Sequence, residues 1–421
     1  MAKQKKNVKS TIISLAFIVV FYAIIAILEN LSLWTPVAEL PKILKPTSML
    51  FTVLKKGAVY SLIAVSMNLL NGFTGLFSLG HAGFMLLGAY TYAILCTPTT
   101  IKQSLYYKYD GSSVNFSIQE LYGKFIDNPN VSMTLGVITT MLLAGLVAAL
   151  FAFLIGLPVL RLKSDYLAIA TLGFAEIVRA LFQWEAPFWA KITNGANMIK
   201  GFPKFTDFNI KRADGTVAFY MATLFPFIVA GICILIMVLI IKSTHGRAFK
   251  SIRDDEIAAE AMGINLAKHK MMSFCISAFF AGIGGVLFAM YSATVQAKPF
   301  TSALTYEILL IVVIGGVGSV SGSCIASILF VACSEWWLRF LDAETTIHNF
   351  FGYDIKVPLL RDGFRMVVFS VVIMIIVLFF RRGIMGDKEL PYMAKAVVSK
   401  VKKLFTRSSK NNVAKEGANN E

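Results

Sequence analysis

The sequence predicts an all-α polytopic membrane protein with about eight to ten transmembrane helices, some of them broken or re-entrant. Hydrophobic residues make up 57% of the 421-residue chain and charged residues only 15%, which is far outside the range of soluble globular domains. Several apolar runs reach the roughly 20 residues that a helix needs to cross a hydrocarbon core about 30 Å thick. These runs predict helices, because a polytopic chain in lipid must satisfy its backbone polar groups internally.

The apolar runs place these helices along the whole chain. The first run follows a basic stretch, but it is too long for a secretory signal and no small-residue cleavage site follows it, so we expect a retained signal anchor. If both termini lie on one side, the interrupted run over residues 304–338 must cross twice or enter and return. The predicted spans are residues 11–28, 51–70, 80–96, 133–157, 166–182, 218–241, 271–291, 304–338 and 364–380.

The net charge of +16 is distributed as in a membrane protein. Lys and Arg concentrate in a head (1–10), a short turn (161–163), a central loop (242–270) and a tail (381–421). The positive-inside rule places these segments, including both termini, in the cytoplasm, with the transmembrane domain over residues 11–380. The tail, which we expect to be partly disordered, is more typical of a segment that contacts anionic membrane lipids than of a nucleic-acid arm, so we expect no nucleic-acid partner. The long connections then lie outside: residues 97–132, 184–217 and 342–362.

The chain shows no pattern typical of an enzyme. The phosphate-binding pattern GxxxxGK[ST] is absent, and no segment has the length of a soluble ATPase domain. The five cysteines lie in or beside apolar runs without CxxC spacing, so we expect small core residues and no metal, cofactor or disulfide. A transporter built in this way uses an ion gradient or a separate ATPase bound at a docking surface.

Clustered small and polar residues interrupt the helical pattern over residues 67–95. Non-helical backbone at membrane depth survives only where protein or a water-filled cavity surrounds it. For any single glycine, a tight helix–helix contact is an equal alternative, but the cluster as a whole favours a broken helix that lines a path. The interrupting residues are Asn68, Asn71, Gly72, Thr74, Gly75, Ser78, Gly80, His81 and Gly83.

A shorter version of this pattern occurs in the second half of the chain. Two interrupted hydrophobic segments, one in each half of a membrane protein, indicate a translocation pathway. We expect the apex of a hairpin at GGVGSVSG, residues 315–322. The interrupting residues are Gly315, Gly316, Gly318, Ser319, Ser321, Gly322 and Ser323.

Two pairs of opposite charges fall inside apolar segments. Glu176 and Arg179 share a helix face at mid-depth and can pair; such charges face the bundle interior. We favour a structural ion pair over a gating pair here. Glu335 and Arg339 are four residues apart and are expected to form a second structural pair.

The central loop is longer than a plain connection needs to be. Asp254 is well placed to cap a short helix whose first turn carries Asp255 and Glu256, Gly263 to end it, and Asn265 to cap the next membrane helix. A short helix of this kind fits a groove on a partner. The alternative is an amphipathic loop that rests on the lipid headgroups.

The same residues resemble a known family. The matching strings occur in the family's order, cover most of residues 57–326, and are similar to the M-type inner-membrane permease of branched-chain amino acid ABC importers. The strings are NGFTGLFSLGHAGFMLLGAYTYAIL, DYLAIATLGFAEIVRALFQ, TNGANMIKGFP, GRAFKSIRDDEIAAEAMGINLAKHKMMSFCISAFFAGIGGVLFAMY and VVIGGVGSVSGS.

The resemblance implies a multi-pass permease of the bacterial cytoplasmic membrane that has no catalytic site of its own. It implies an H-type permease partner, two cytoplasmic ATP-binding subunits and an extracytoplasmic substrate-binding protein. Leucine, isoleucine and valine are the expected cargo, with urea or another small amide or amino acid, or an ion-coupled secondary transporter, as alternatives. The residues implied for ATPase coupling are Arg247, Arg253, Asp254, Glu256, Ala259 and Gly263. Those implied for the pathway are Asn71, Thr74, Gly75, Ser78, His81, Gly315, Gly318, Ser319 and Ser321, and we assign His81 no proton-carrying role.

Overall fold

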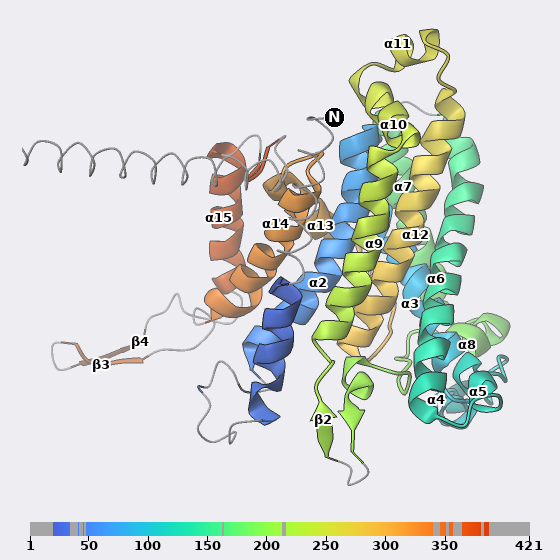
Figure 1. The fold of residues 1–421 in the computed structure, drawn as a ribbon, viewed down its shortest axis with the longest axis vertical. Coiled ribbons are helices and arrows are strands. Elements are labelled where there is room, and N and C mark those ends of the chain that lie inside the picture. The colour runs from blue at the N-terminus through green and yellow to red at the C-terminus, as the bar shows by residue number, and fades with distance from the viewer. Residues whose placement is uncertain are drawn as a thin grey trace, which may run out of the picture.

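The computed structural model is a bundle of long helices whose axes run roughly parallel (Figure 1). Six described helices are long and apolar enough to cross a membrane, or seven if a bent pair counts as one span, so the prediction of an all-α polytopic membrane protein is confirmed. The basic head and nearly all of the basic tail lie outside the described residues, as do residues 342–345, 351–352 and 357–362 of the last long connection. The described residues are 20–33, 41, 45, 48–161, 164–212, 216–339, 346–350, 353–356, 364–379 and 383–386.

The predicted apolar runs correspond to helices wherever the structure describes them. The six long helices of the described residues are α2 (Met49–Asn68), α6 (Pro129–Val159), α7 (Ser164–Gln183), α9 (Leu224–Lys242), α12 (Leu266–Ser292) and the span Val320–Trp337, which consists of α14 (Val320–Ala332) and η6 (Cys333–Trp337). The shorter apolar helices are Val20–Asn30, α3 (His81–Cys96), α13 (Ser302–Gly315) and α15 (Phe364–Phe379).

The core of the bundle is made by α12, which packs against α6, α3 and α2. Small residues allow this packing, as they do in other membrane bundles. A Cβ on Gly88 of α3 would lie 2.7 Å from the backbone Cα of Gly282 on α12. Outside this core, Leu146 and Leu150 of α6 and Leu239 of α9 are more than half exposed, which suits a surface that meets lipid.

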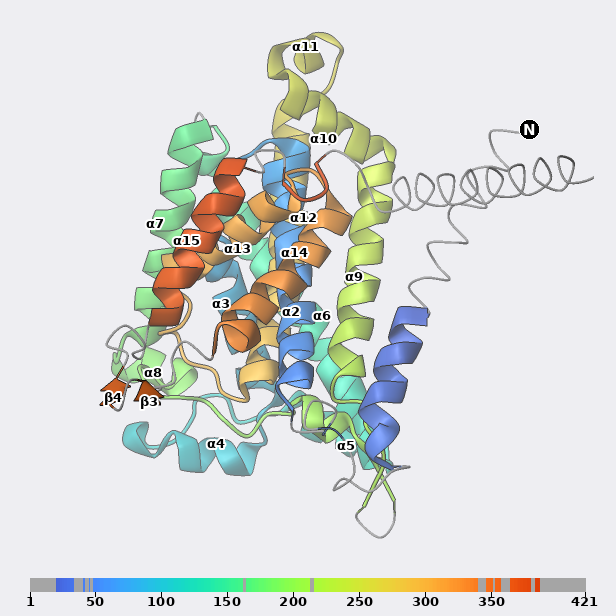
Figure 2. The same ribbon diagram turned by 90° about the vertical axis from the view of Figure 1, so that its left-hand side faces the viewer.

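The two ends of the bundle carry different elements (Figures 1 and 2). One end, here named the α11 end, carries α10 (Thr244–Asp254) and α11 (Glu256–Ala261). The other end, the α4 end, carries short helices and small hairpins. These are α4 (Thr99–Leu105), η4 (Tyr107–Tyr109), α5 (Ile118–Gly123), α8 (Pro187–Thr193), η5 (Phe205–Phe208), β1 (Ile210–Lys211) and β2 (Val217–Phe219).

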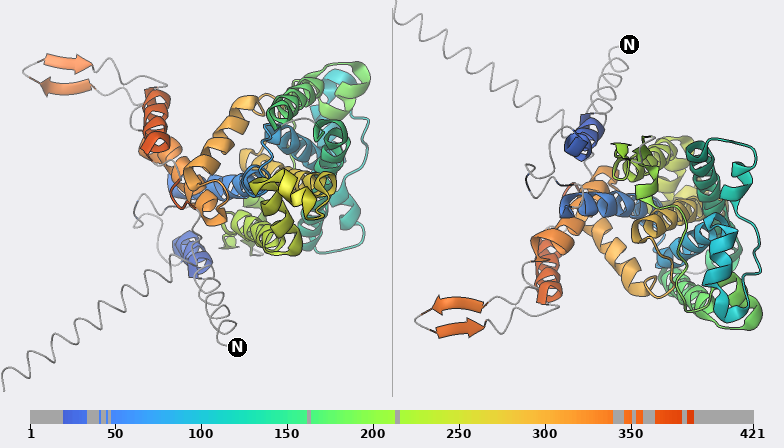
Figure 3. Two further views of the ribbon diagram at one scale, coloured as in Figure 1. Left: turned by 90° about the horizontal axis from the view of Figure 1, so that it is seen from above. Right: turned by 90° about the horizontal axis from the view of Figure 1, so that it is seen from below.

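Two apolar helices lie on the outside of the bundle, on either side of α2 and α14 (Figure 3). In one, Ile25 of the helix Val20–Asn30 packs with Ala58 of α2 and Phe227 of α9. In the other, Phe369 of α15 meets Phe330 of α14 with ring centroids 4.9 Å apart. The remaining described elements are η1 (Leu31–Leu33) and the paired strands β3 (Thr346–Phe350) and β4 (Tyr353–Lys356).

Both predicted interruptions occur. After α2 the chain forms a π-helical stretch, η3 (Leu69–Thr74), and then runs without regular structure from Gly75 to Gly80 before α3 begins. In the second half, α13 ends at Gly315 and α14 begins at Val320, with the last turn of α13 packed against the first turn of α14. The sharp turn lies inside residues 315–322, where the sequence predicts the apex.

The contact between α3 and α12 can be tested with Gly88→Ala. Alanine is intrinsically favoured over glycine in a helix by about 1 kcal/mol, but here its Cβ would meet the Gly282 backbone, and overpacking of this kind costs roughly 1–3 kcal/mol. We therefore expect a lower midpoint of thermal unfolding in detergent.

The matched control is Gly173→Ala on α7, where a Cβ would meet no atom within 4 Å. This variant should keep or raise the unfolding midpoint. Equal midpoints for the two variants would contradict the packing described for α3 and α12.

Candidate translocation and coupling site

The two breaks are joined by one buried side chain, that of Asn68 at the end of α2. Its Nδ2 donates to the Ser319 carbonyl at 2.9 Å and to the Ser323 Oγ at 2.8 Å. Its Oδ1 accepts from the Gly318 N–H at 2.8 Å. Asn68, which directly precedes the first break, thus provides hydrogen-bond partners for backbone groups of the second break. Its side chain is fully buried. The sequence shows Asn68 as one interrupting residue among several and does not single it out.

The first break is held in shape by its own polar side chains. The Asn71 amide exchanges two hydrogen bonds with the backbone of Ser78, at 3.4 and 3.2 Å, and so closes the loop between them. The Thr74 Oγ1 donates to the Leu69 carbonyl at 3.1 Å, and Gly75 takes a left-handed conformation with φ of 77°. The structure places these predicted pathway residues at one end of the core, with Thr74 and Ser78 buried.

His81 is the first residue of α3 and is 1% exposed. Its Nε2 lies 3.1 Å from the Ser277 Oγ of α12, whose single proton is donated to the Ser66 carbonyl at 2.6 Å. The Nε2 atom is therefore the protonated one and donates to the Ser277 Oγ, because Ser277 has no second proton to give. The buried Nδ1 atom has no hydrogen-bond partner among the described residues. This arrangement ties the start of α3 to α12 and α2.

The starts of α3 and α13 meet each other and α7. The Ala82 N–H of α3 donates to the Thr305 Oγ1 of α13 at 3.2 Å. From α7, the Thr171 Oγ1 accepts from the Leu79 N–H at 3.0 Å. Helix starts leave N–H groups without partners, and here α13 and α7 supply acceptors for N–H groups at and just before the start of α3.

The Glu176 carboxylate completes this junction. One oxygen accepts from the Ser302 N–H, the first residue of α13, at 3.1 Å. The other lies 2.7 Å from the Arg179 Nε and 2.7 Å from its Nη2. A carboxylate at a helix start is favoured by the helix dipole. Glu176 and Arg179 thus form an ion pair that also links α7 to α13.

At the second break the backbone leaves the helical region at Gly316 and Gly318, with φ of 111° and 87°. The Ser319 Oγ caps α14 by accepting from the Gly322 N–H at 3.1 Å. Ile384 and Met385 donate their N–H groups to the Ile314 and Gly315 carbonyls at 2.8 and 3.3 Å. Of the remaining predicted pathway residues in this break, Gly315 is buried and Ser321 is half-buried.

The central loop differs from the prediction in its helix boundaries. The sequence places Asp254 as the cap of one short helix, but α10 extends to Asp254 and the cap of α11 is Asp255. The Asp255 Oδ1 accepts from the Ile257 and Ala258 N–H groups at 2.8 and 3.0 Å. Because Asp255 is extended and caps α11, the central loop contains two helices, α10 and α11, instead of one. Gly263, with φ of 84°, and Asn265, which caps α12, lie where the sequence predicts them.

The predicted coupling residues do not all face outward. Ala259 is 3% exposed, so its side chain is covered within the chain. Glu256 pairs with Lys270 of α12 at 2.6 Å. The exposed apolar groups on α11 are instead Ile257 and Met262, at 82% and 84%. Sequence periodicity could not find them, because a helix of six residues is too short to show a face. Arg247 and Gly263 are exposed.

The predicted pairing of Glu335 with Arg339 is wrong. Glu335 pairs with Lys56 of α2, whose Nζ lies 2.5 Å from the Glu335 Oε1. Arg339 instead reaches the Met49 Sδ, with its Nη1 at 3.6 Å. The π-helical turns of η6 change the rotation of these residues, so an α-helical spacing of four no longer brings them together.

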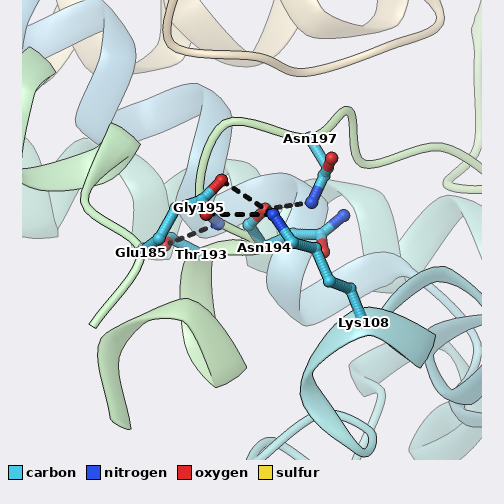
Figure 4. A network of polar contacts seen from close by, with 6 residues as sticks. All are labelled: Lys108, Glu185, Thr193, Asn194, Gly195 and Asn197. Carbon is cyan, nitrogen blue, oxygen red and sulfur yellow. Dashed lines mark hydrogen bonds and ion pairs between the residues drawn. The ribbon is translucent and has the colours of Figure 1, made fainter. Parts of the chain in front are cut away.

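The α4 end carries a polar network of its own (Figure 4). Lys108 and Glu185 form an exposed ion pair at 2.9 Å. The hydrogen bond to Glu185 raises the pKa of Lys108, and the same bond lowers the pKa of Glu185. Beside it, Asn194 and Gly195 form a turn with φ of 62° and 55°.

Taken together, these features define a helical membrane permease: two broken helices meet inside the bundle, and a helical projection leaves the bundle at the same end. A family profile described as "Branched-chain amino acid transport system / permease component" matches residues 49–382. The chain belongs to that family, which confirms the resemblance seen in the sequence.

Named relatives agree with the profile. The chain is 34% identical over 296 residues to the "High-affinity branched-chain amino acid transport system permease protein LivM" of Salmonella typhimurium and to that of Escherichia coli. In each case the match covers 66% of this chain and 61% of the relative, so the chain spans about three fifths of their length.

A "Probable branched-chain amino acid transport permease protein LivM" of Methanocaldococcus jannaschii is 24% identical over 359 residues, covering 81% of this chain and 94% of the relative. No solved structure matches the chain at a significant level.

The link between the breaks can be tested with Asn68→Leu, which keeps the volume but removes the amide. The Gly318 N–H then loses its partner, and a buried unpaired group costs about 1–3 kcal/mol. The Ser319 carbonyl keeps the Ser323 N–H and Oγ as donors. We expect hydrogen exchange at residues 316–323 to accelerate by at least about tenfold in the purified protein.

Asn130→Leu at the exposed start of α6 is the control and should leave exchange at residues 316–323 unchanged. Unchanged exchange in Asn68→Leu as well would show that the second break does not depend on Asn68.

Proposed function

We propose that the chain is the transmembrane permease subunit of an ATP-driven importer of branched-chain amino acids, and that it forms the translocation pathway with a second permease subunit. The proposal draws on the family membership and on the names of the relatives. The observation that carries it is the helical projection α10–α11, which presents exposed apolar side chains away from the bundle and sits at the end where both breaks meet.

Two cytoplasmic ATP-binding subunits are the partners that this projection suits. Ile257 and Met262 are large apolar groups at 82% and 84% exposure, outside the long helices that cross the membrane. Two large apolar groups exposed within six residues of each other on a short helical projection suit a groove on another protein. The basic residues Arg247 and Lys250 of α10 support, by the positive-inside rule, the proposal that this end and both termini lie in the cytoplasm.

This orientation determines which partner meets the α4 end, and the names of the relatives suggest the cargo. The α4 end then faces outward, where an extracytoplasmic binding protein delivers the substrate. Leucine, isoleucine and valine are the cargo proposed from the names of the relatives; urea or another small amide or amino acid is the alternative. The ATP is hydrolysed by the partner subunits, because the chain has no phosphate-binding loop of its own.

The pathway is proposed to follow the two breaks and the junction of α3, α7 and α13. Broken helices supply backbone polar groups to a path, and the ion pair Glu176–Arg179 lies at the junction of α3, α7 and α13. Closure of the ATP-binding subunits would push α10–α11 and tilt the helices that begin beside them, α12 above all.

Docking is tested with Ile257→Arg and Met262→Arg, each made in the full chain. Both side chains are exposed in the chain alone, so the fold should be retained. In the complex, the arginine would bring a charge into the apolar contact with the partner. We expect co-purification of the ATP-binding subunits and ATP-dependent leucine uptake to fall at least about tenfold, since loss of an apolar anchor costs about 2 kcal/mol or more.

The control is Ile210→Arg, an isoleucine at the α4 end that is 48% exposed, which should keep the ATP-binding subunits bound. Normal co-purification of both α11 variants would refute the docking surface. Leucine uptake that persists without ATP and collapses with the proton or sodium gradient would favour an ion-coupled transporter instead.

A further inference from the structure

Arg253, at the end of α10, lies where the projection meets both breaks. Its Nη1 donates to the Gly72 carbonyl of η3 at 3.2 Å. The sequence places Arg253 among the residues that contact a partner, but its guanidinium reaches back into the chain. Across 181 positions of sequence, this hydrogen bond joins the projection to the first break.

The fit of Arg253 on the first break requires glycine. Gly75 has φ of 77°, and a Cβ at this position would lie 2.9 Å from the Arg253 Cγ. The stem of Arg253 therefore packs directly on the backbone that ends η3. Lys250, one turn earlier on α10, adds a second contact, with its Nζ 5.5 Å from the centroid of the Phe73 ring.

The same guanidinium borders the second break. A Cβ on Gly318 would lie 3.3 Å from the Arg253 Nη1 and 3.7 Å from the Gly72 carbonyl oxygen. Gly318 has φ of 87° and donates its N–H to Asn68. Backbone from η3 and from the α13–α14 turn thus meets beside one charged group of α10.

The chemistry of this contact suits arginine in particular. The last carbonyls of a helix lack intrahelical partners and carry the negative end of the dipole, so the Gly72 carbonyl at the end of η3 favours a cationic donor. The Asp254 Oδ1 accepts from the Arg253 Nε and Nη2 at 3.1 and 2.9 Å. The guanidinium holds Asp254 with two donors and Gly72 with a third in one fixed plane, a geometry that the single ammonium of a lysine does not reproduce.

We propose that Arg253 is the positioning residue that transmits movement between the α10–α11 projection and the two broken helices. Displacement of α10 moves the guanidinium, and the guanidinium moves the Gly72 carbonyl and the adjoining Gly318 turn. That the movement starts at the projection rests on the proposed function, in which an ATPase binds at α11. The connection itself does not depend on any partner.

The connection is tested first in the full chain alone, in detergent or nanodiscs, by hydrogen exchange of Arg253→Met. We expect exchange at residues 69–75 and 316–319 to accelerate roughly tenfold, as for loss of a hydrogen bond to a charged group. Arg253→Lys should give intermediate rates. Lys268→Met, which removes an exposed cation from the first turn of α12, is the control and should leave both regions unchanged. Exchange altered only within α10 would overturn the proposal.

The second test uses the complex purified from its native membrane with its partner subunits. Arg253→Met should retain the ATP-binding subunits and hydrolyse ATP, yet lose at least about tenfold of leucine uptake per ATP, with partial recovery in Arg253→Lys. Unchanged uptake per ATP would overturn the transmission role, and loss of the ATP-binding subunits would show that Arg253 acts in docking. If the unaltered chain binds no ATP-binding subunit, the proposed function fails, while the exchange experiment still decides the connection.

Discussion

The structure depends on one constraint, which is that every backbone polar group at membrane depth needs a partner inside the protein. Two helical runs end in glycine-rich breaks, and each break frees N–H and carbonyl groups. The two breaks lie against each other. The Asn68 amide at the end of α2 accepts from the Gly318 N–H and donates to the Ser319 carbonyl, and each of these hydrogen bonds joins one break to the other. A residue without exposed surface thus holds together two segments that neither half of the chain could stabilise alone.

The molecule has a rigid part, where regular helices pack closely, and a second part, where backbone groups freed from helices are held by a few hydrogen bonds. Around α12, glycines bring helix backbones into direct contact over several turns, and close packing of that kind resists deformation. At the two breaks, by contrast, the backbone is held by individual hydrogen bonds from Asn68 and Asn71. Movement during transport is therefore best accommodated at the breaks.

Much of this architecture could be predicted from the sequence, because helices and breaks are local features. Apolar length marks the helices, clustered glycines mark the breaks, and Gly263 and Asn265 mark the end of the projection and the start of α12. The cap was misplaced by one residue, since Asp254 and Asp255 are chemically equivalent and only the backbone decides between them. The sequence therefore predicts one short helix capped by Asp254, whereas the structure has α10 before the Asp255 cap and α11 after it.

The contacts that join these elements could not be predicted, because they connect residues that are distant in the chain. Asn68 and Ser319 are 251 positions apart, and Arg253 and Gly72 are 181 apart. Periodicity shows that a residue lies on a helix face but not which helix it meets. For this reason Glu335 was paired with Arg339 instead of Lys56, and Ala259 was expected at a surface that Ile257 and Met262 occupy.

The central claim is that the two breaks and α10 form one connected unit. A double-mutant cycle on the free energy of unfolding tests it most directly, using Asn68→Leu, Arg253→Met and the double variant. Residues that share partners couple by about 0.5–3 kcal/mol, whereas independent sites add within about 0.5 kcal/mol. The account predicts a coupling energy of at least about 1 kcal/mol, because both side chains hold the backbone around Gly72 and Gly318. Strict additivity of the two substitutions would contradict it.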